Sequence, residues 1–234
     1  MTNSIGSWTR RHSQRVVSSI NNGPTHGPLS ADELRARFAG TSMPGDPLDV
    51  VMPPGLKRWP HAMREQLAGP LTPAGVLVPL MQGSGGLSIL LTQRAAHLKT
   101  HAAQASFPGG RMEAHDPDVR ATALRETHEE VGVAPEQVEV IGYLRSMPTI
   151  TGFAVTPVVG LVSEEARLVV DRTEVDYTFE LPLDFLLNEG NDLLVDREWE
   201  GRRFRLKEFH YDGERVWGVT AYLLLAFREY VLNQ

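Results

Sequence analysis

The pattern of apolar residues after residue 74 predicts a series of β-strands. Two apolar runs flank the segment Gly83-Ser84-Gly85-Gly86, which is the signal of a β-hairpin. Turn-forming pairs at Glu200-Gly201 and Asp212-Gly213 separate later strands that are rich in aromatic residues. The apolar runs themselves predict strands over 76–81, 87–92, 138–144 and 154–162, and another within 169–180.

Three helices are predicted around these strands. Ser30-Ala31-Asp32-Glu33 forms a capping box that opens a short helix ending near Gly40. A second short helix is expected over 182–187, and an apolar helix over 220–230 closes the chain. Strands and helices in this order predict an α/β fold, specifically an α/β/α sandwich with a mixed sheet. Residues 1–70, which include a Pro-rich stretch, are interpreted as an N-terminal extension, and 71–234 as one domain.

A further helix is the best marked of all. Asp116 is expected at its N-cap, Pro117 at its first position and Gly132 just past its end. At the angular spacing of an α-helix, Leu124, Thr127 and Val131 share one face. We expect that face to pack on the core.

The end of this helix carries three acidic side chains, Glu126, Glu129 and Glu130. Like charges at i,i+3 and i,i+4 spacing repel each other, whereas a bound Mg²⁺ or Mn²⁺ would make the arrangement favourable. Arg125 stands four residues before Glu129 and is expected to pair with it. The alternative is a solvated acidic helix end, which the coincidence with Arg125 and a preceding glycine segment makes the weaker interpretation.

Candidate substrate-binding residues precede the helix. Arg94 and Lys99 can meet phosphate charge, although ordinary surface cations would look the same. Gly109 and Gly110 are expected in a loop that leads into the helix, where they can allow positive φ and close approach of a substrate, as they would also allow an ordinary turn. Clustered carboxylates that hold a metal, with these cations nearby, suit hydrolysis of a diphosphate.

From Arg125 to Val133 the sequence resembles the motif of the Nudix hydrolases, with Thr127 in place of an aliphatic residue. That motif runs Gly, five residues, Glu, seven residues, Arg-Glu-aliphatic-any-Glu-Glu-any-Gly-aliphatic. Its first half departs here, because the acid that follows Gly110 at the right distance is Asp116, and eight residues separate it from Arg125. The resemblance implies a metal-dependent pyrophosphatase in which Arg125, Glu126, Glu129 and Glu130 are catalytic and the three glutamates bind Mg²⁺ or Mn²⁺.

A second resemblance narrows the class. The segment from Leu90 to Gly110 is similar to the one that precedes this motif in coenzyme A pyrophosphatases, as are 174–183 and 216–221. It implies cleavage of the diphosphate of coenzyme A into 4′-phosphopantetheine and adenosine 3′,5′-bisphosphate. The alternatives are another diphosphate, such as ADP-ribose, a dinucleotide or a nucleoside triphosphate, and a non-catalytic ligand-sensing protein. Some Nudix enzymes add an acid to the metal cluster where Glu174 lies.

Composition limits the remaining possibilities. A net charge of -6 argues against broad nucleic-acid binding, and no stretch approaches the length of a membrane span. Cysteine is absent, which removes disulfides and thiol chemistry and fits a cytoplasmic protein. The first 31 residues lack Asp and Glu and carry three arginines, so they are either an organelle transit segment or, as we prefer, an N-terminal arm. Oligomeric state is not predicted.

Overall fold

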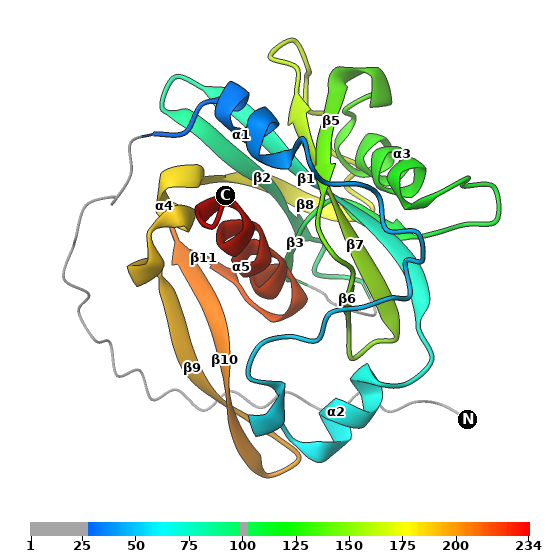
Figure 1. Ribbon diagram of the computed structural model, residues 1–234, viewed down its shortest axis with the longest axis vertical. Helices are drawn as coiled ribbons and strands as arrows, with labels where there is room; N and C mark the ends of the chain where they lie inside the picture. The colour runs from blue at the N-terminus through cyan, green and yellow to red at the C-terminus, as the bar shows by residue number, and fades with distance from the viewer. Residues whose placement is uncertain (1–27, 99–102) are drawn as a thin grey trace.

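The computed structural model describes residues 28–98 and 103–234, which form five α-helices, three short 3-10 helices and eleven strands (Figure 1). The α-helices are α1 (Ala31–Phe38), α2 (His61–Leu67), α3 (Val119–Val131), α4 (Leu183–Leu187) and α5 (Gly218–Leu232). The 3-10 helices are η1 (Leu56–Arg58), η2 (Pro135–Gln137) and η3 (Glu189–Asn191). The strands are β1 (Thr72–Gly83), β2 (Gly86–Arg94), β3 (Ala105–Ser106), β4 (Gly109–Arg111), β5 (Val138–Tyr143), β6 (Met147–Pro148), β7 (Phe153–Val162), β8 (Val175–Pro182), β9 (Asp192–Trp199), β10 (Arg202–Tyr211) and β11 (Glu214–Val216).

The large sheet is mixed, with the order β3-β2-β1-β7-β5. Its central pair, β1 and β7, is parallel, whereas β2 and β4 pair with β1 in antiparallel fashion at its two ends. β8 runs antiparallel to β2, and β6 to β7. β4 pairs with the beginning of β1, and β2 pairs with its end. Between these two paired stretches, β2 and β4 separate from each other. The predicted hairpin over 76–92 is confirmed.

Side chains alternate across this sheet and separate two cores. Leu77, Leu90 and Val158 belong to the cluster that α3 covers. Their neighbours Val78 and Ile89 belong to the larger cluster that contains residues of α1 and α5. Figure 1 shows α3 and α5 on opposite sides of the sheet. The predicted α/β fold with a mixed sheet between helices is therefore confirmed.

A second, three-stranded sheet follows α4, in the order β11-β10-β9. Its two turns lie at the predicted pairs, where Glu200 and Asp212 both have φ of 48° and are each followed by a glycine with positive φ. Two consecutive residues with positive φ are typical of the tightest hairpin turns. α5 contacts β10 and joins this sheet to the main body (Figure 1).

The N-terminal segment from residue 28 packs against the rest of the chain. Leu34 and Phe38 of α1 and Met63 of α2 are buried in the same core as the main sheet. Phe38 stacks on Phe227, with ring centroids 5.7 Å apart. The sequence did not indicate η1 or α2, and the division of the chain at residue 71 stays a prediction. Within the described ranges, no helix is long and apolar enough to cross a membrane.

Two local predictions are wrong. α3 begins at Val119 and is capped by Asp118, whose side chain accepts a hydrogen bond from the amide of Ala121, so Asp116 is not the N-cap and Pro117 lies outside the helix. The segment at Gly109 is a strand that pairs with β1, and not an irregular loop. The strand at Gly109 forms because it pairs with β1, which is distant in sequence. Asp116 does not cap α3 because its carboxylate is bound by Arg125.

Replacing Phe38 by alanine should destabilise the protein by about 3–5 kcal/mol, because it leaves a cavity in a fully buried aromatic cluster. Urea unfolding followed by circular dichroism measures this difference. Leu194→Ala, at a side chain that is 51% exposed, is the matched control and should cost well under 1 kcal/mol. Equal effects of the two substitutions would mean that α1 is not part of the core.

Candidate active site

The second half of α3 carries the three predicted carboxylates. As expected, Leu124, Thr127 and Val131 are buried, and the Thr127 hydroxyl donates to the carbonyl of Ala123 at 2.6 Å. This hydrogen bond satisfies the polar group that stands where the family motif has an aliphatic side chain. The side chains of the three glutamates, in contrast, differ widely in exposure, with 2% for Glu130, 17% for Glu126 and 57% for Glu129.

Arg125 links the exposed end of this series to a buried acid. Its Nη1 atom donates to Glu126 Oε1 and to Glu129 Oε2, at 2.9 Å each. Its Nε and Nη2 atoms donate to the two carboxylate oxygens of Asp116, at 3.0 and 2.9 Å. Asp116 is itself held by the Thr122 hydroxyl at 3.0 Å. The hydrogen bonds from Arg125 hold the pKa of the Asp116 carboxyl well below its usual range.

Asp116 therefore fixes the position of Arg125. A bidentate arginine–carboxylate contact orients the guanidinium plane as well as its charge. The sequence pattern left Asp116 open as a mere cap or turn residue, because its spacing to Arg125 departs from the family motif by one residue. The structure accommodates the extra residue in the turn before α3 and still brings the two side chains together. The charge of both residues was the only signal in the sequence that could have suggested this pair.

Glu130 lies beneath the surface with few partners. Its Oε2 atom accepts from the amide of Gly109 at 3.3 Å, and its Oε1 atom lies 3.5 Å from Nη1 of Arg94. Burial raises the pKa of Glu130 to about 8, and the nearby charges of Glu126 and Glu174 add to the rise, while Arg94 and the Gly109 amide oppose it. The Nε atom of Arg94 is buried and has no hydrogen-bond partner among the described residues.

Gly110 allows α3 to approach β4 closely, and Gly109 allows β4 to approach β1. A Cβ atom at Gly110 would lie 2.4 Å from the carboxylate carbon of Glu126. Gly109 has φ of +151°, and a Cβ atom there would lie 2.6 Å from Cα of Val76. Both spaces are therefore filled by the protein itself. Their predicted contact with a substrate stays a prediction, while their contribution to the position of Glu126 and Glu130 follows from the geometry.

Glu174 adds a fourth acidic side chain to this region. It precedes β8 and is exposed, and its carbonyl accepts a hydrogen bond from the amide of Ala95 at 2.9 Å. Burial raises the pKa of Glu126, and the charges of Glu129 and Glu174 raise it further against the effect of Arg125. Glu174 thus lies near enough to repel both inner glutamates. Lys99, which the sequence placed among the phosphate contacts, lies outside the described residues.

The donor set fits a hard divalent cation, because carboxylate oxygens crowded together in a partly buried place gain from a bound positive charge. In the described part of the chain, no three carboxylates or imidazoles converge on one point as the side chains stand. Arg125 is the reason at the outer end, since its Nη1 atom contacts both Glu126 and Glu129. The Arg125 guanidinium neutralises the charge of these two carboxylates, as a bound metal cation would.

The site thus brings together most of the residues that the sequence singled out. These are Arg94, Gly109, Gly110, Arg125, Glu126, Glu129 and Glu130. They come from β2, β4 and α3. The contribution of β4 to the position of Glu130, through the Gly109 amide, was not predicted.

Comparison with known proteins places these residues in a family. The family model of the NUDIX domain matches residues 71–217. The chain is 40% identical to a protein described as "Uncharacterized Nudix hydrolase NudL" from Enterobacter sp. (strain 638) over 148 residues, which are 63% of this chain and 77% of that protein. It is 41% identical to a protein of the same description from Salmonella paratyphi B over 151 residues, 64% of this chain and 78% of that protein.

The solved structures to which the chain is similar are more distant in sequence. A MutT/nudix family protein from Enterococcus faecalis is 20% identical and has a TM-score of 0.47, covering 71% of this chain and 64% of that one. A C. elegans Ap4A hydrolase binary complex is also 20% identical, with a TM-score of 0.41, covering 47% of this chain and 80% of that one. The family model spans more than half of the chain and includes the whole carboxylate-bearing helix. The chain belongs to the Nudix family, and it is a Nudix pyrophosphatase.

Proposed function

We propose that this protein hydrolyses the diphosphate bond of coenzyme A or acyl-coenzyme A. The products are 4′-phosphopantetheine, or its acyl form, and adenosine 3′,5′-bisphosphate. The observation that supports this choice is the contact between Arg94 and Glu130 at 3.5 Å. Arg94 belongs to the segment whose sequence resembles coenzyme A pyrophosphatases, and Glu130 belongs to the Nudix motif. The segment that sets this group of enzymes apart therefore contacts the candidate catalytic carboxylates.

Glu126, Glu129 and Glu130 are the proposed ligands of a divalent cation, Mg²⁺ or Mn²⁺. Such a cation, when bound, neutralises charge on the phosphoryl oxygens and lowers the pKa of a bound water. Glu130 is the innermost ligand of the three, and Glu129 is exposed enough to reach a water molecule or the substrate. Arg125, fixed by Asp116, keeps the outer two carboxylates in place.

Cationic side chains complete the proposed mechanism. Arg94 has one side-chain nitrogen near Glu130 and a buried Nε atom without a partner among the described residues, so it retains donor capacity for a phosphate oxygen. Lys99 is proposed to contact phosphate as well. Charge-assisted contacts of this kind hold a diphosphate in line with an attacking water.

A panel of substrates tests the proposed function directly. Purified protein with Mg²⁺ or Mn²⁺ should cleave coenzyme A and acyl-coenzyme A, and mass spectrometry should identify the two products. ADP-ribose, a dinucleotide and a nucleoside triphosphate serve as competing substrates. Much faster cleavage of ADP-ribose than of coenzyme A would contradict the proposal. Binding of a nucleotide without any cleavage would favour a ligand-sensing protein instead.

Glu130→Gln should lower kcat by several powers of ten, since it removes a ligand charge at the innermost position while preserving shape. Circular dichroism and thermal unfolding should show that the fold persists. Glu136→Gln, at an exposed residue just beyond the helix, is the matched control and should retain full activity. Activity close to the wild-type level in Glu130→Gln would show that the metal is held elsewhere.

The raised pKa of Glu130 predicts that the stability of the metal-free protein depends on pH. Because the pKa of Glu130 is raised by burial to about 8, the folded state keeps a proton that the unfolded state loses above its ordinary pKa. The stabilisation that comes from the protonated Glu130 carboxyl is fully present below the ordinary pKa of glutamate. It is lost as the pH rises towards 8, by up to about 1.4 kcal/mol per pH unit. Glu130→Gln removes this dependence.

With EDTA present, the Tm of the wild type should therefore fall relative to that of Glu130→Gln between pH 5.5 and pH 8. Differential scanning fluorimetry across this range measures the difference. Adding Mn²⁺ should restore the wild type and leave the variant largely unchanged. A Tm difference that stays constant with pH would mean that burial does not raise the pKa of this carboxyl.

A further inference from the structure

A second buried carboxylate lies in the second sheet, away from α3. The Glu208 side chain on β10 is 2% exposed. It accepts hydrogen bonds from Nη2 of Arg197 at 2.5 Å and from Nη2 of Arg215 at 3.0 Å. The Nε2 atom of His210 lies 2.8 Å from its other oxygen. Two guanidinium charges against one carboxylate charge leave one positive charge in excess.

This cation cluster, Arg197, His210 and Arg215 around Glu208, lies on the face of the sheet opposite to that from which Phe209 and Val216 enter the core. On the cluster's face of β10, Phe204, Leu206 and Glu208 are buried, and beyond them the alternation ends because Phe209 on the other face is buried too. Arg197 shares this face because it pairs with Phe204. Excess positive charge beside a buried carboxylate is costly for a fold, since desolvation opposes it.

The cluster is nevertheless accessible and rigid. The side chains of Arg197, His210 and Arg215 are 23%, 43% and 38% exposed. Arg215 donates to Glu208 through Nε and Nη2, and its guanidinium carbon lies 5.0 Å from the ring centroid of Trp217. Two such contacts fix the plane of the guanidinium, and its Nη1 atom has no hydrogen bond to a residue within 28–98 or 103–234.

Two hydrogen bonds connect the second sheet and the start of α5 to β3 and β8, the strands that flank Arg94 on β2. The Thr220 hydroxyl, at the start of α5, donates to the carbonyl of Ala105 on β3 at 3.1 Å. The Tyr177 hydroxyl on β8 donates to Glu214 on β11 at 2.9 Å. Ala105 and Tyr177 both pair with Gln93, the neighbour of Arg94. The edge strand β11, which carries Arg215, therefore lies beside β3 and β8, the two strands that pair with β2 next to Arg94.

We infer that the cation cluster binds a phosphomonoester on the nucleoside half of the substrate, at a distance from the diphosphate that is cleaved. This inference rests on the proposed function, in which that group is the 3′-phosphate of the adenosine. A phosphomonoester dianion has several acceptor oxygens and suits the excess positive charge and oriented N–H donors of two arginines. The cluster would thus make the enzyme prefer diphosphates that carry an additional phosphate over those that do not.

Steady-state kinetics with coenzyme A and 3′-dephospho-coenzyme A test this subsite. The wild type should show a KM for coenzyme A at least about tenfold lower than for the dephospho form, the effect of one charge-assisted hydrogen bond. Arg215→Ala and Arg197→Ala should bring the ratio of the two KM values close to one, with kcat much less affected. Arg215→Lys should restore part of the ratio because it keeps the charge.

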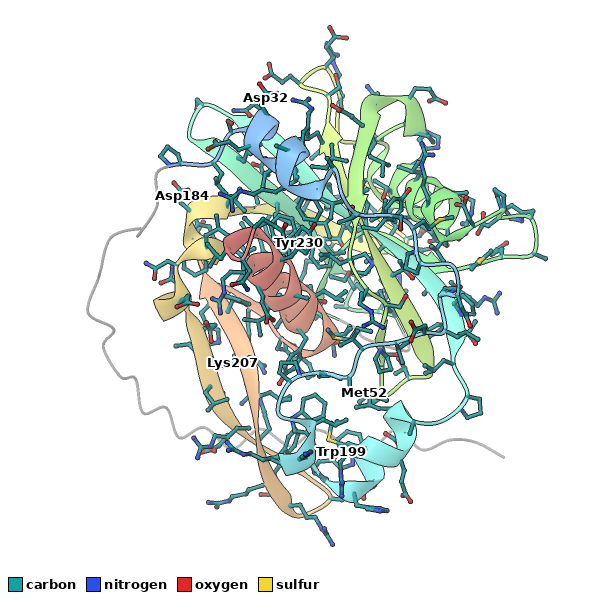
Figure 2. The ribbon with its side chains drawn as sticks, in the orientation of Figure 1. Asp32, Met52, Asp184, Trp199, Lys207 and Tyr230 are labelled. Carbon is teal, nitrogen blue, oxygen red and sulfur yellow. The ribbon has the colours of Figure 1, made fainter. Side chains whose placement is uncertain are left out.

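Lys207→Ala is the matched control. Lys207, labelled on β10 in Figure 2, contacts the buried Asp192 together with Arg228, and it lies one residue from Glu208 on the opposite face. The ratio of the two KM values in Lys207→Ala should stay at the wild-type value. If Arg215→Ala, like Lys207→Ala, leaves the ratio of the two KM values at the wild-type value, the cluster has only a structural role and the inference is overturned.

Binding without turnover separates this inference from the proposed function. Calorimetry with wild-type protein should show tighter binding of adenosine 3′,5′-bisphosphate than of adenosine 5′-monophosphate, and Arg215→Ala should remove the preference. Cleavage of coenzyme A without such a preference would overturn the subsite and leave the proposed function standing. The preference without cleavage of coenzyme A would support the subsite and contradict the proposed function.

Discussion

The close contact between α3 and β4 is the constraint on which the site depends. Gly110 leaves room for the Glu126 carboxylate, and the Gly109 amide donates to Glu130. A side chain at Gly110 would collide with the Glu126 carboxylate on α3, and one at Gly109 would collide with the backbone of β1. The glycine pair therefore serves first to place the acids near the part of β1 that lies between its pairing with β4 and its pairing with β2.

The electrostatics around these acids are arranged in two zones. In the outer zone, Arg125 neutralises Glu126 and Glu129 and is itself fixed by the buried Asp116. In the inner zone, Glu130 has only a long amide contact and a distant guanidinium, so burial raises its pKa. A fold rarely keeps a poorly partnered carboxylate inside unless a ligand supplies the missing charge. The inner zone is where the proposed cation would contribute most to stability.

The second sheet repeats this use of buried charge with the opposite sign. Glu208 gathers Arg197, Arg215 and His210 on one face of this sheet. Hydrogen bonds to Ala105 and Tyr177 tie the sheet and α5 to the strands beside Arg94. The proposed cation site on α3 and the proposed anion site on the second sheet are thus connected through β2, β3 and β8. Such a pair of sites suits a substrate with a diphosphate at one place and a separate phosphate at another.

Local sequence patterns determined much of this protein by themselves. Alternating apolar residues, capping residues and glycine turns indicated the hairpin of β1 and β2, the helices α1, α3 and α5, and the turns of the second sheet, because these depend on neighbours in the chain. Spacing within one helix likewise placed Arg125 beside Glu129.

Tertiary structure decided the rest, for a physical reason that recurs at each place. The start of α3, the strand at Gly109, the packing of α2 and the partners of Asp116, Glu130 and Glu208 all depend on residues brought together from distant parts of the chain. A single sequence records which charges exist but not which of them become buried side by side. Burial and pairing then set their pKa values, and with them the chemistry that the site can perform.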